Sequence, residues 1–303
     1  MPLLSQHFNI IENGSHYTGA EKVRKGYILL IPVSKYFKCN NIEIHCRQWS
    51  ENGHPLLLIH GITSSSTSWD RIAPQLASKY KVFALDLRGH GLSSKPEHGY
   101  DWIKDYAKDV SEFIRIHIKD PPIIIGHSLG ASVTAAVAAN PAPQLLAIIL
   151  EDPPAFLDNE PGIVSERFAS TLDMKALPFE EKVKAFMDTG REWPPKSMEI
   201  NRELAEYKAL NLENTADAVI TEIRTENTSY RAESLYPNIK CPCLVLLGNP
   251  NLGGLVEFDD RKRLSSILKQ AAIKEFPDAG HGLHNDAEKD FLKHVNQFLV
   301  SLG

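Results

Sequence analysis

Ser128 is the residue of this chain with the clearest chemical potential. It is the central residue of Gly126-His-Ser-Leu-Gly130, which follows an apolar run and precedes an alanine-rich segment. A G-x-S-x-G pentapeptide in that setting predicts a sharp turn from a buried strand into a helix. Because the turn lifts the Ser128 hydroxyl to a helix N-terminus, free N–H groups there favour negative charge. The motif therefore predicts a nucleophilic serine that attacks a carbonyl.

Such a serine needs hydrogen-bond donors for the carbonyl oxygen that becomes negative during attack. His60-Gly61-Ile62 follows the apolar run Pro55–Ile59, so a glycine-permitted turn can aim the Ile62 N–H at that oxygen. The Leu129 N–H is the second donor that we expect. Ile62 and Leu129 are thus the predicted oxyanion hole.

A serine hydroxyl also needs a base to take its proton. Among the twelve histidines, His281 stands between two glycines, after the last apolar run and before the C-terminal helical pattern. His127 is the runner-up because it adjoins Ser128. His284, three residues beyond His281, could suggest a metal pair, but no third ligand lies at suitable spacing. We therefore expect His281 to be the base, and no metal.

Four blocks together give the chain a family resemblance. They are Pro55–Gly61, Asp86–Pro96, Gly126–Gly130 and Asp278–Gly282, and their order and spacing are similar to those of the α/β-hydrolase superfamily. The resemblance implies the α/β-hydrolase fold and a Ser, His and acid triad with Ser128 and His281. It also implies a helical cap over the site.

The acid is the triad member for which the sequence departs from the family pattern. The family most often places an aspartate after the strand here expected at Cys243–Leu247, but Asn249 and Asn251 occupy that turn. The preceding strand ends in Glu151-Asp152, from which a carboxylate can reach the same histidine. Glu151 is the first choice because its extra methylene helps to cover the distance. Asp152 is the second choice, since alternation points one of the two away.

The apolar pattern indicates a mostly parallel central sheet with helices on both faces, the α/β class. Short continuous apolar blocks are typical of strands buried on both sides, whereas spacings of three and four are typical of amphipathic helices. The predicted strands are Ile42–Trp49, Pro55–Ile59, Lys81–Leu87, Pro122–Gly126, Leu145–Leu150, Cys243–Leu247 and Ile273–Phe276. The predicted helices are Trp69–Lys79, Trp102–Ile118, Leu129–Ala139, Asp259–Lys269 and Ala287–Leu299.

One segment is too long to be an ordinary crossover. Residues 155–235 separate two predicted strands and are rich in Glu, Lys, Ala and Leu, which favours a helical insertion. We therefore divide the chain into a core of residues 1–154 and 236–303 and a cap, or lid, of residues 155–235. Trp193, in a Trp-Pro-Pro sequence, is the expected wall of the substrate pocket.

Composition excludes several partners. The 33 basic and 38 acidic residues give a net charge of −5 without a long basic block, so nucleic acid is not expected. No apolar run approaches the roughly 20 residues of a membrane span, and no secretory signal is evident, so a cytoplasmic protein is expected. The glycines of the serine motif lack the third glycine of a dinucleotide loop, and no cofactor is implied.

The sequence thus predicts a cofactor-free serine hydrolase that cleaves a carboxylic ester or lactone of a moderately apolar small molecule through an acyl-enzyme on Ser128. Two alternatives remain open. One is a carbon–carbon bond hydrolase, because the fold alone does not separate these reactions. The other is a ligand receptor on a hydrolase scaffold, suggested by Asn249 and Asn251 where an aspartate is expected. Oligomeric state is not predicted.

Overall fold

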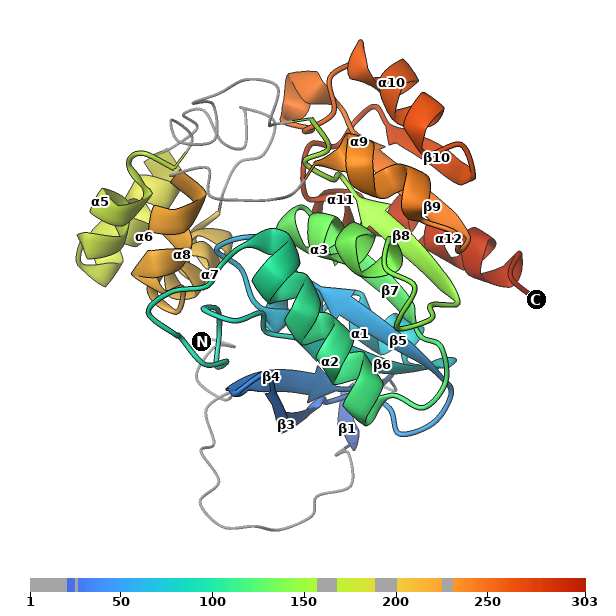
Figure 1. Cartoon of the computed structure of the whole chain (residues 1–303). Helices are drawn as coiled ribbons and strands as arrows, with labels where there is room; N and C mark the ends of the chain where they lie inside the picture. The colour runs from blue at the N-terminus through green and yellow to red at the C-terminus, as the bar shows by residue number, and fades with distance from the viewer. Residues whose placement is uncertain (1–20, 25–26, 157–167, 189–200, 225–230) are drawn as a thin grey trace.

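The fold is built on an eight-stranded sheet (Figure 1). The computed structural model describes residues 21–24, 27–156, 168–188, 201–224 and 231–303. The strand order is β10-β9-β8-β7-β5-β6-β4-β3, and β1 and β2 form a separate hairpin. The strands are β1 (Glu21–Arg24), β2 (Tyr27–Leu30), β3 (Val33–Cys39), β4 (Ile42–Gln48), β5 (His54–Ile59), β6 (Tyr80–Leu85), β7 (Ile123–His127), β8 (Ala147–Glu151), β9 (Cys243–Gly248) and β10 (Ala271–Phe276).

Strand direction confirms the mostly parallel sheet predicted from the apolar blocks. From β6 to β10 every neighbouring pair is parallel, while β4 pairs antiparallel with both β3 and β6. The chain leaves β5 for β6 on one side and returns to β7 on the other. In open α/β sheets, ligands bind outside the carboxyl ends of strands where the order reverses in this way. The Ser128 turn follows β7 at that point.

Helices cover both faces of the sheet, as predicted. They are α1 (Ala73–Leu76), α2 (Lys108–His117), α3 (Leu129–Ala138), α10 (Asp260–Ile267), α11 (Leu283–Asp286) and α12 (Glu288–Val300). The predicted helix at Trp69–Lys79 is wrong in extent: a 3₁₀ turn at Ser66–Trp69 is followed by the short α1. Pro74 lies at the start of α1, and proline is tolerated in a first helical turn but not in a helix interior.

The core divides into two layers because successive strand residues point to opposite faces. Leu57 and Ile124 belong to the buried layer under α2 and α3. Leu56 and Ile125 belong to the other layer, with residues of α1 and α12. Both layers are nearly fully buried, which fixes the strand register and thereby the positions at which the strands end.

In the described residues between β8 and β9, five helices lie within the segment predicted as an insertion. They are α5 (Thr171–Ala176), α6 (Phe179–Asp188), α7 (Arg202–Glu213), α8 (Asp217–Arg224) and α9 (Ala232–Leu235). In Figure 1, α5 to α8 gather beside the sheet, whereas α9 lies near β9. The predicted division into core and cap stays a prediction. Trp193 lies outside the described residues.

The α7 helix contacts a loop at the carboxyl end of the sheet. Its Tyr207 hydroxyl lies 3.4 Å from the Ser64 hydroxyl, two residues beyond Ile62. Near α8, the Ala216 N–H donates to the Gly89 carbonyl at 2.7 Å. These contacts place α7 and α8 over the edge of the sheet where the Ser128 turn lies.

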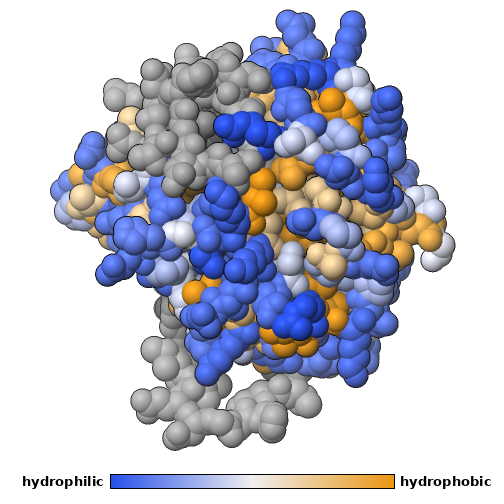
Figure 2. Space-filling view, in the orientation of Figure 1, coloured by the Kyte–Doolittle hydropathy of each residue, from blue (hydrophilic) through white to orange (hydrophobic). Residues whose placement is uncertain are grey.

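The surface is mainly polar on the face of Figure 2, with apolar residues gathered toward its centre and right. Within the described part of the chain, no helix has both the length and the apolar character needed to span a membrane.

Candidate active site

Ser128 occupies a strained backbone conformation between β7 and α3. Its φ of 54° and ψ of −120° lie in a region that residues with side chains rarely adopt. Its N–H donates to the Glu151 carbonyl at 3.0 Å, and its carbonyl accepts from Ala131 and Ser132 in the first turn of α3. The strain is therefore held by the neighbouring strand and by the helix, and it fixes where the hydroxyl lies.

The two glycines of the motif are required by close backbone approach. A Cβ on Gly126 would lie 2.2 Å from the Gly130 carbonyl oxygen, and a Cβ on Gly130 would lie 2.2 Å from the Ile59 carbonyl oxygen. Both distances are far below van der Waals contact. Side chains at positions 126 and 130 would therefore collide with neighbouring elements.

His281 is held by Asp152. The His281 Nδ1 lies 2.7 Å from Asp152 Oδ2, and the Asp152 side chain is fully buried. Because a carboxylate accepts, Nδ1 carries the proton, and in this tautomer the lone pair of the ring lies on Nε2. This is the tautomer that general-base catalysis by His281 needs.

The expectation that Glu151 would hold His281 is wrong in this structure. Both Glu151 oxygens lie 2.8 Å from His284 Nδ1, and Oε1 also accepts the His284 N–H at 2.8 Å. The prediction favoured Glu151 for the reach of its side chain. The direction in which each side chain leaves the strand end determines which histidine it binds. Asp152 leaves the strand with a φ of 40°, so its carboxylate and that of Glu151 diverge toward different histidines.

The turn after β9 supports the acid without supplying it. Asp152 Oδ1 accepts the Gly248 N–H at 3.0 Å, and Oδ2 accepts the Leu255 N–H at 2.9 Å. Asn249 uses its side chain to cap the turn at Asn251 and to donate to the Pro277 carbonyl. The asparagine turn therefore holds the carboxylate of the preceding strand in place.

His127 links the serine turn to the histidine loop. Its Nε2–H donates to the His281 carbonyl at 3.0 Å, and the two ring centroids lie 4.6 Å apart. Burial lowers the pKa of His127 to about 3, so the ring is neutral at ordinary pH. A neutral ring that donates to a backbone carbonyl is placed to fix the loop, and the base assignment stays with His281.

The expected oxyanion donors adjoin the serine. A Cβ placed on Gly61 would lie only 3.1 Å from Ser128 Cβ, so the loop that carries Ile62 passes directly beside Ser128. Leu129 is the first residue of α3, and its N–H is one of the unpaired donors of that helix start. Among the described residues, neither the Ile62 N–H nor the Leu129 N–H donates to another group of the protein.

Burial also sets the charge of Glu151 and His284, the second carboxyl and histidine pair. It raises the pKa of Glu151 to about 7 and lowers the pKa of His284 to about 3. Trp69 stacks on His284 with ring centroids 4.4 Å apart, which shields the pair from water. Both shifts favour a protonated Glu151 carboxyl and a neutral His284 imidazole, a pair without net charge.

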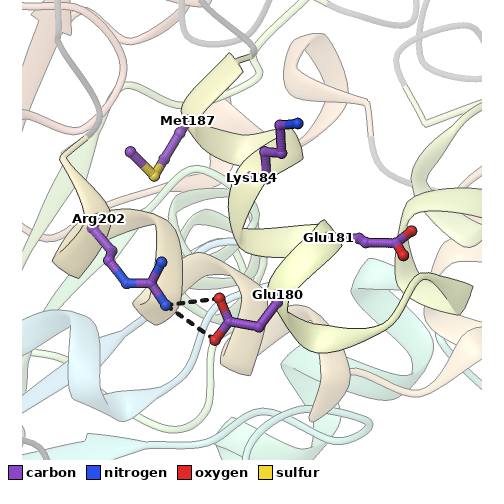
Figure 3. Close-up of a pocket in the computed structure, with 5 residues that line it drawn as sticks. All are labelled: Glu180, Glu181, Lys184, Met187 and Arg202. Carbon is purple, nitrogen blue, oxygen red and sulfur yellow. Dashed lines mark hydrogen bonds and ion pairs between the residues drawn. The ribbon is translucent and has the colours of Figure 1, made fainter.

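The described residues provide neither a metal centre nor a second serine site at the pocket on α6 and α7. Within those residues, no group of three or more His, Cys, Asp or Glu side chains could hold a metal ion. Figure 3 shows a surface pocket on α6 and α7, where Arg202 donates to both Glu180 oxygens at 2.8 and 3.0 Å. Its other lining residues are Glu181, Lys184 and Met187. None of the residues that line this pocket is a serine, a cysteine or a histidine.

Sequence reasoning missed the role of His284 as the partner of Glu151. A signal was present, because two neighbouring carboxylates, Glu151 and Asp152, match two histidines, His281 and His284, three residues apart. Considering both pairs together would have shown that each carboxylate can take one histidine.

Comparison with known proteins gives the class of the protein. Residues 56–293 match the model of the alpha/beta hydrolase family. The chain belongs to this family, as its resemblance predicted, and is a hydrolase of the family.

Several relatives have known names. Over 106 residues the chain is 41% identical to 2-(acetamidomethylene)succinate hydrolase of Mesorhizobium japonicum. This aligned region is 34% of this chain and only 37% of that protein. It is 25% identical over 268 residues to N-formylmaleamate deformylase of Pseudomonas putida, covering 86% of this chain and 94% of that protein. Its fold is also similar to the crystal structure of the enol-lactonase from Burkholderia xenovorans, with a TM-score of 0.73 and 21% identity. The match covers 88% of this chain and 100% of the enol-lactonase chain.

Proposed function

We propose that this hydrolase cleaves a carboxylic ester or lactone of a moderately apolar small molecule through an acyl-enzyme on Ser128. The observation that carries the proposal is the His281–Asp152 hydrogen bond, in a loop that His127 ties to the strained Ser128 turn. A base in the correct tautomer therefore belongs to the same sheet edge as the nucleophile. No cofactor takes part in the proposed reaction.

The proposed mechanism moves one proton at each stage. His281 Nε2 takes the Ser128 proton as Oγ attacks the carbonyl carbon, and the Ile62 and Leu129 N–H groups stabilise the oxyanion. Asp152 stabilises the imidazolium. His281 then gives the proton to the leaving alkoxide, which departs and leaves the acyl group on Ser128. Water loses a proton to the same ring and attacks the acyl carbon. The bond from that carbon to Ser128 Oγ then breaks, the acid leaves, and the ring returns the proton to Oγ.

The relatives widen the substrate panel that should be tested. The names 2-(acetamidomethylene)succinate and N-formylmaleamate describe compounds that carry carboxylates and an acylated nitrogen. An acyl-enzyme mechanism also serves such N-acyl bonds, because the tetrahedral intermediate and the oxyanion are the same. The panel therefore includes an N-acyl substrate, a lactone and a substrate for carbon–carbon cleavage beside simple esters.

Lys208 is a candidate group for recognising a substrate carboxylate. It lies one residue after Tyr207 on α7, is half-buried, and makes no ion pair within the described part of the chain. Burial lowers the pKa of Lys208, while Asp286 opposes that change. Asp286 follows His281 by five residues, so its effect on the pKa of Lys208 supports a position of the ammonium near the histidine loop. We propose that an anionic substrate would place its carboxylate there.

The structure weakens the argument for the receptor alternative. That reading relied on the missing aspartate at Asn249 and Asn251, but a buried carboxylate does meet His281. A receptor has no need of a base held in the catalytic tautomer.

The test combines p-nitrophenyl esters of increasing acyl length with a macrocyclic lactone, an N-acyl dicarboxylate, a carbon–carbon cleavage substrate and a fluorophosphonate probe. We expect stoichiometric labelling of Ser128, turnover of short acyl esters, and loss of both in Ser128→Ala. Labelling without turnover of any substrate would favour the receptor. Absence of labelling would overturn the nucleophile assignment.

A further inference from the structure

Glu151 contacts both the backbone of Ser128 and the loop that carries His281. Its main-chain carbonyl accepts the Ser128 N–H at 3.0 Å, and its carboxyl accepts the His284 N–H at 2.8 Å. The strand register also fixes the position of Glu151, because Glu151 on β8 pairs with His127 on β7. One residue thus connects the backbone of the nucleophile with the loop of the base.

The loop of residues 281–284 is held from three directions. Asp152 binds the His281 ring, His127 donates to the His281 carbonyl, and Glu151 binds both the N–H and Nδ1 of His284. His284 is in turn fixed on its other faces. Trp69 stacks on the ring, and Asn285 Nδ2 donates to Nε2 at 2.9 Å.

We infer that Glu151 and His284 form a positioning pair that sets the place of His281 relative to Ser128 without touching the substrate. This inference rests on the proposed function. Glu151 and His284 are both essentially inaccessible to solvent, at 0% and 1% exposure, so neither can meet a substrate. Removal of the pair frees one end of the loop that carries the base. A displacement of about 1 Å at a reacting group can cost about 10²-fold in rate.

The charges around the pair explain why a neutral arrangement suits it. Glu151 is surrounded by His127 on β7, Asp152 directly after β8, His281 on the loop and Asp286 on α11. Arg71 is a cation that acts on His284. An ionised Glu151 would compete with Asp152 for the imidazolium of His281. A protonated or proton-sharing carboxyl positions the loop and leaves Asp152 as the only counter-charge.

The experiment compares Glu151→Ala with Glu151→Gln, whose amide oxygen can still accept the His284 N–H. We expect Glu151→Ala to lower kcat about 10²-fold with KM little changed. Glu151→Gln should keep kcat within about threefold and leave the pH profile of kcat/KM unmoved. Val82→Ala, a fully buried truncation on β6, is the matched control for lost stability alone and should keep kcat. Folded Glu151→Ala with wild-type kcat would overturn the inference.

Two further measurements cover the remaining cases. If Glu151→Ala does not fold, His284→Phe keeps a ring against Trp69 but removes Nδ1; it should lower kcat about tenfold, and an unchanged kcat would overturn the inference. Proton NMR tests positioning without turnover. The downfield Nδ1–H signal of His281 should persist in Glu151→Gln and be lost or shifted in Glu151→Ala. An unchanged signal in folded Glu151→Ala contradicts the inference, whereas failure of wild-type labelling and turnover contradicts only the proposed function.

Discussion

Asp152 Oδ2 lies 2.7 Å from His281 Nδ1, although Asp152 leaves the sheet from β8 and not from β9. The carboxylate is completed by two N–H donors of the turn after β9, at Gly248 and Leu255. The segment at the end of β9, which has no acid of its own, therefore orients Asp152 at the end of the neighbouring β8. The unusual asparagines of that turn are compatible with a working Ser, His and acid arrangement.

The first prediction concerns Asp152. Asp152→Asn should lower kcat by about 10⁴, because an amide cannot balance the imidazolium and can donate to Nδ1, which favours the wrong tautomer. The measurement is kcat on the best ester from the substrate panel, with far-UV circular dichroism to verify folding. Asp259→Asn, at an exposed position before α10, is the control and should keep full activity. A rate within tenfold of wild type would remove Asp152 from the triad.

The second prediction concerns the glycine turn. Gly130→Ala should destabilise the protein by about 1–3 kcal/mol or more, because its Cβ would lie 2.2 Å from the Ile59 carbonyl oxygen. Gly282→Ala is the matched control, since its Cβ would meet nothing closer than 3.8 Å and its φ is −102°. Urea unfolding measures both. Equal stability of the two variants would mean that the Ser128 turn can relax.

Most of the sheet could be predicted because two-sided burial gives a strand an unmistakable composition. Leu56–Ile59 and Ile123–Ile125 are continuous apolar blocks, and the structure places them in the central strands. The strand Val33–Cys39 was not predicted, because its alternating half-buried pattern is that of an edge strand with few neighbours. Strands at an edge leave a weaker mark in the sequence than buried ones.

The site shows the limit of reasoning from residue type. Ser128 and His281 could be singled out as candidates because glycines mark the turns that carry them. The choice between Glu151 and Asp152 depends on a backbone torsion at the strand end, and nothing in the residue types specifies a φ of 40° at Asp152. Alternation applies within a strand and no longer holds one residue beyond it.

The third prediction is a pH dependence of stability. Burial raises the pKa of Glu151 from its ordinary value of 4.5 to about 7. Between those values the folded state keeps a proton that the unfolded chain has lost, so this group lowers the free energy of unfolding as pH rises, on the order of 3 kcal/mol in total. His127 and His284 act with the opposite sign, because their lowered pKa destabilises the fold as pH falls below about 6.5.

The Glu151 contribution is isolated by difference. Free energies of unfolding are measured from pH 4.5 to 7.5 for the wild type and for Glu151→Gln, which cannot titrate. The wild type should lose stability relative to the variant as pH rises, with Glu257→Gln at an exposed position as the control. A constant difference across the range would show that Glu151 is ionised throughout in the folded protein.

The fourth prediction concerns Lys208 and substrate charge. Lys208→Met keeps most of the side-chain volume on α7 but removes the ammonium, so it should raise KM for a carboxylate-bearing substrate about 10–100-fold, the range of a hydrogen bond to a charged group. The uncharged methyl ester of the same substrate is the internal control and should show little change. The kcat of both should be nearly unaffected, because Lys208 has no part in the proposed proton transfers. If the two substrates lost affinity equally, Lys208 would shape the pocket without recognising charge.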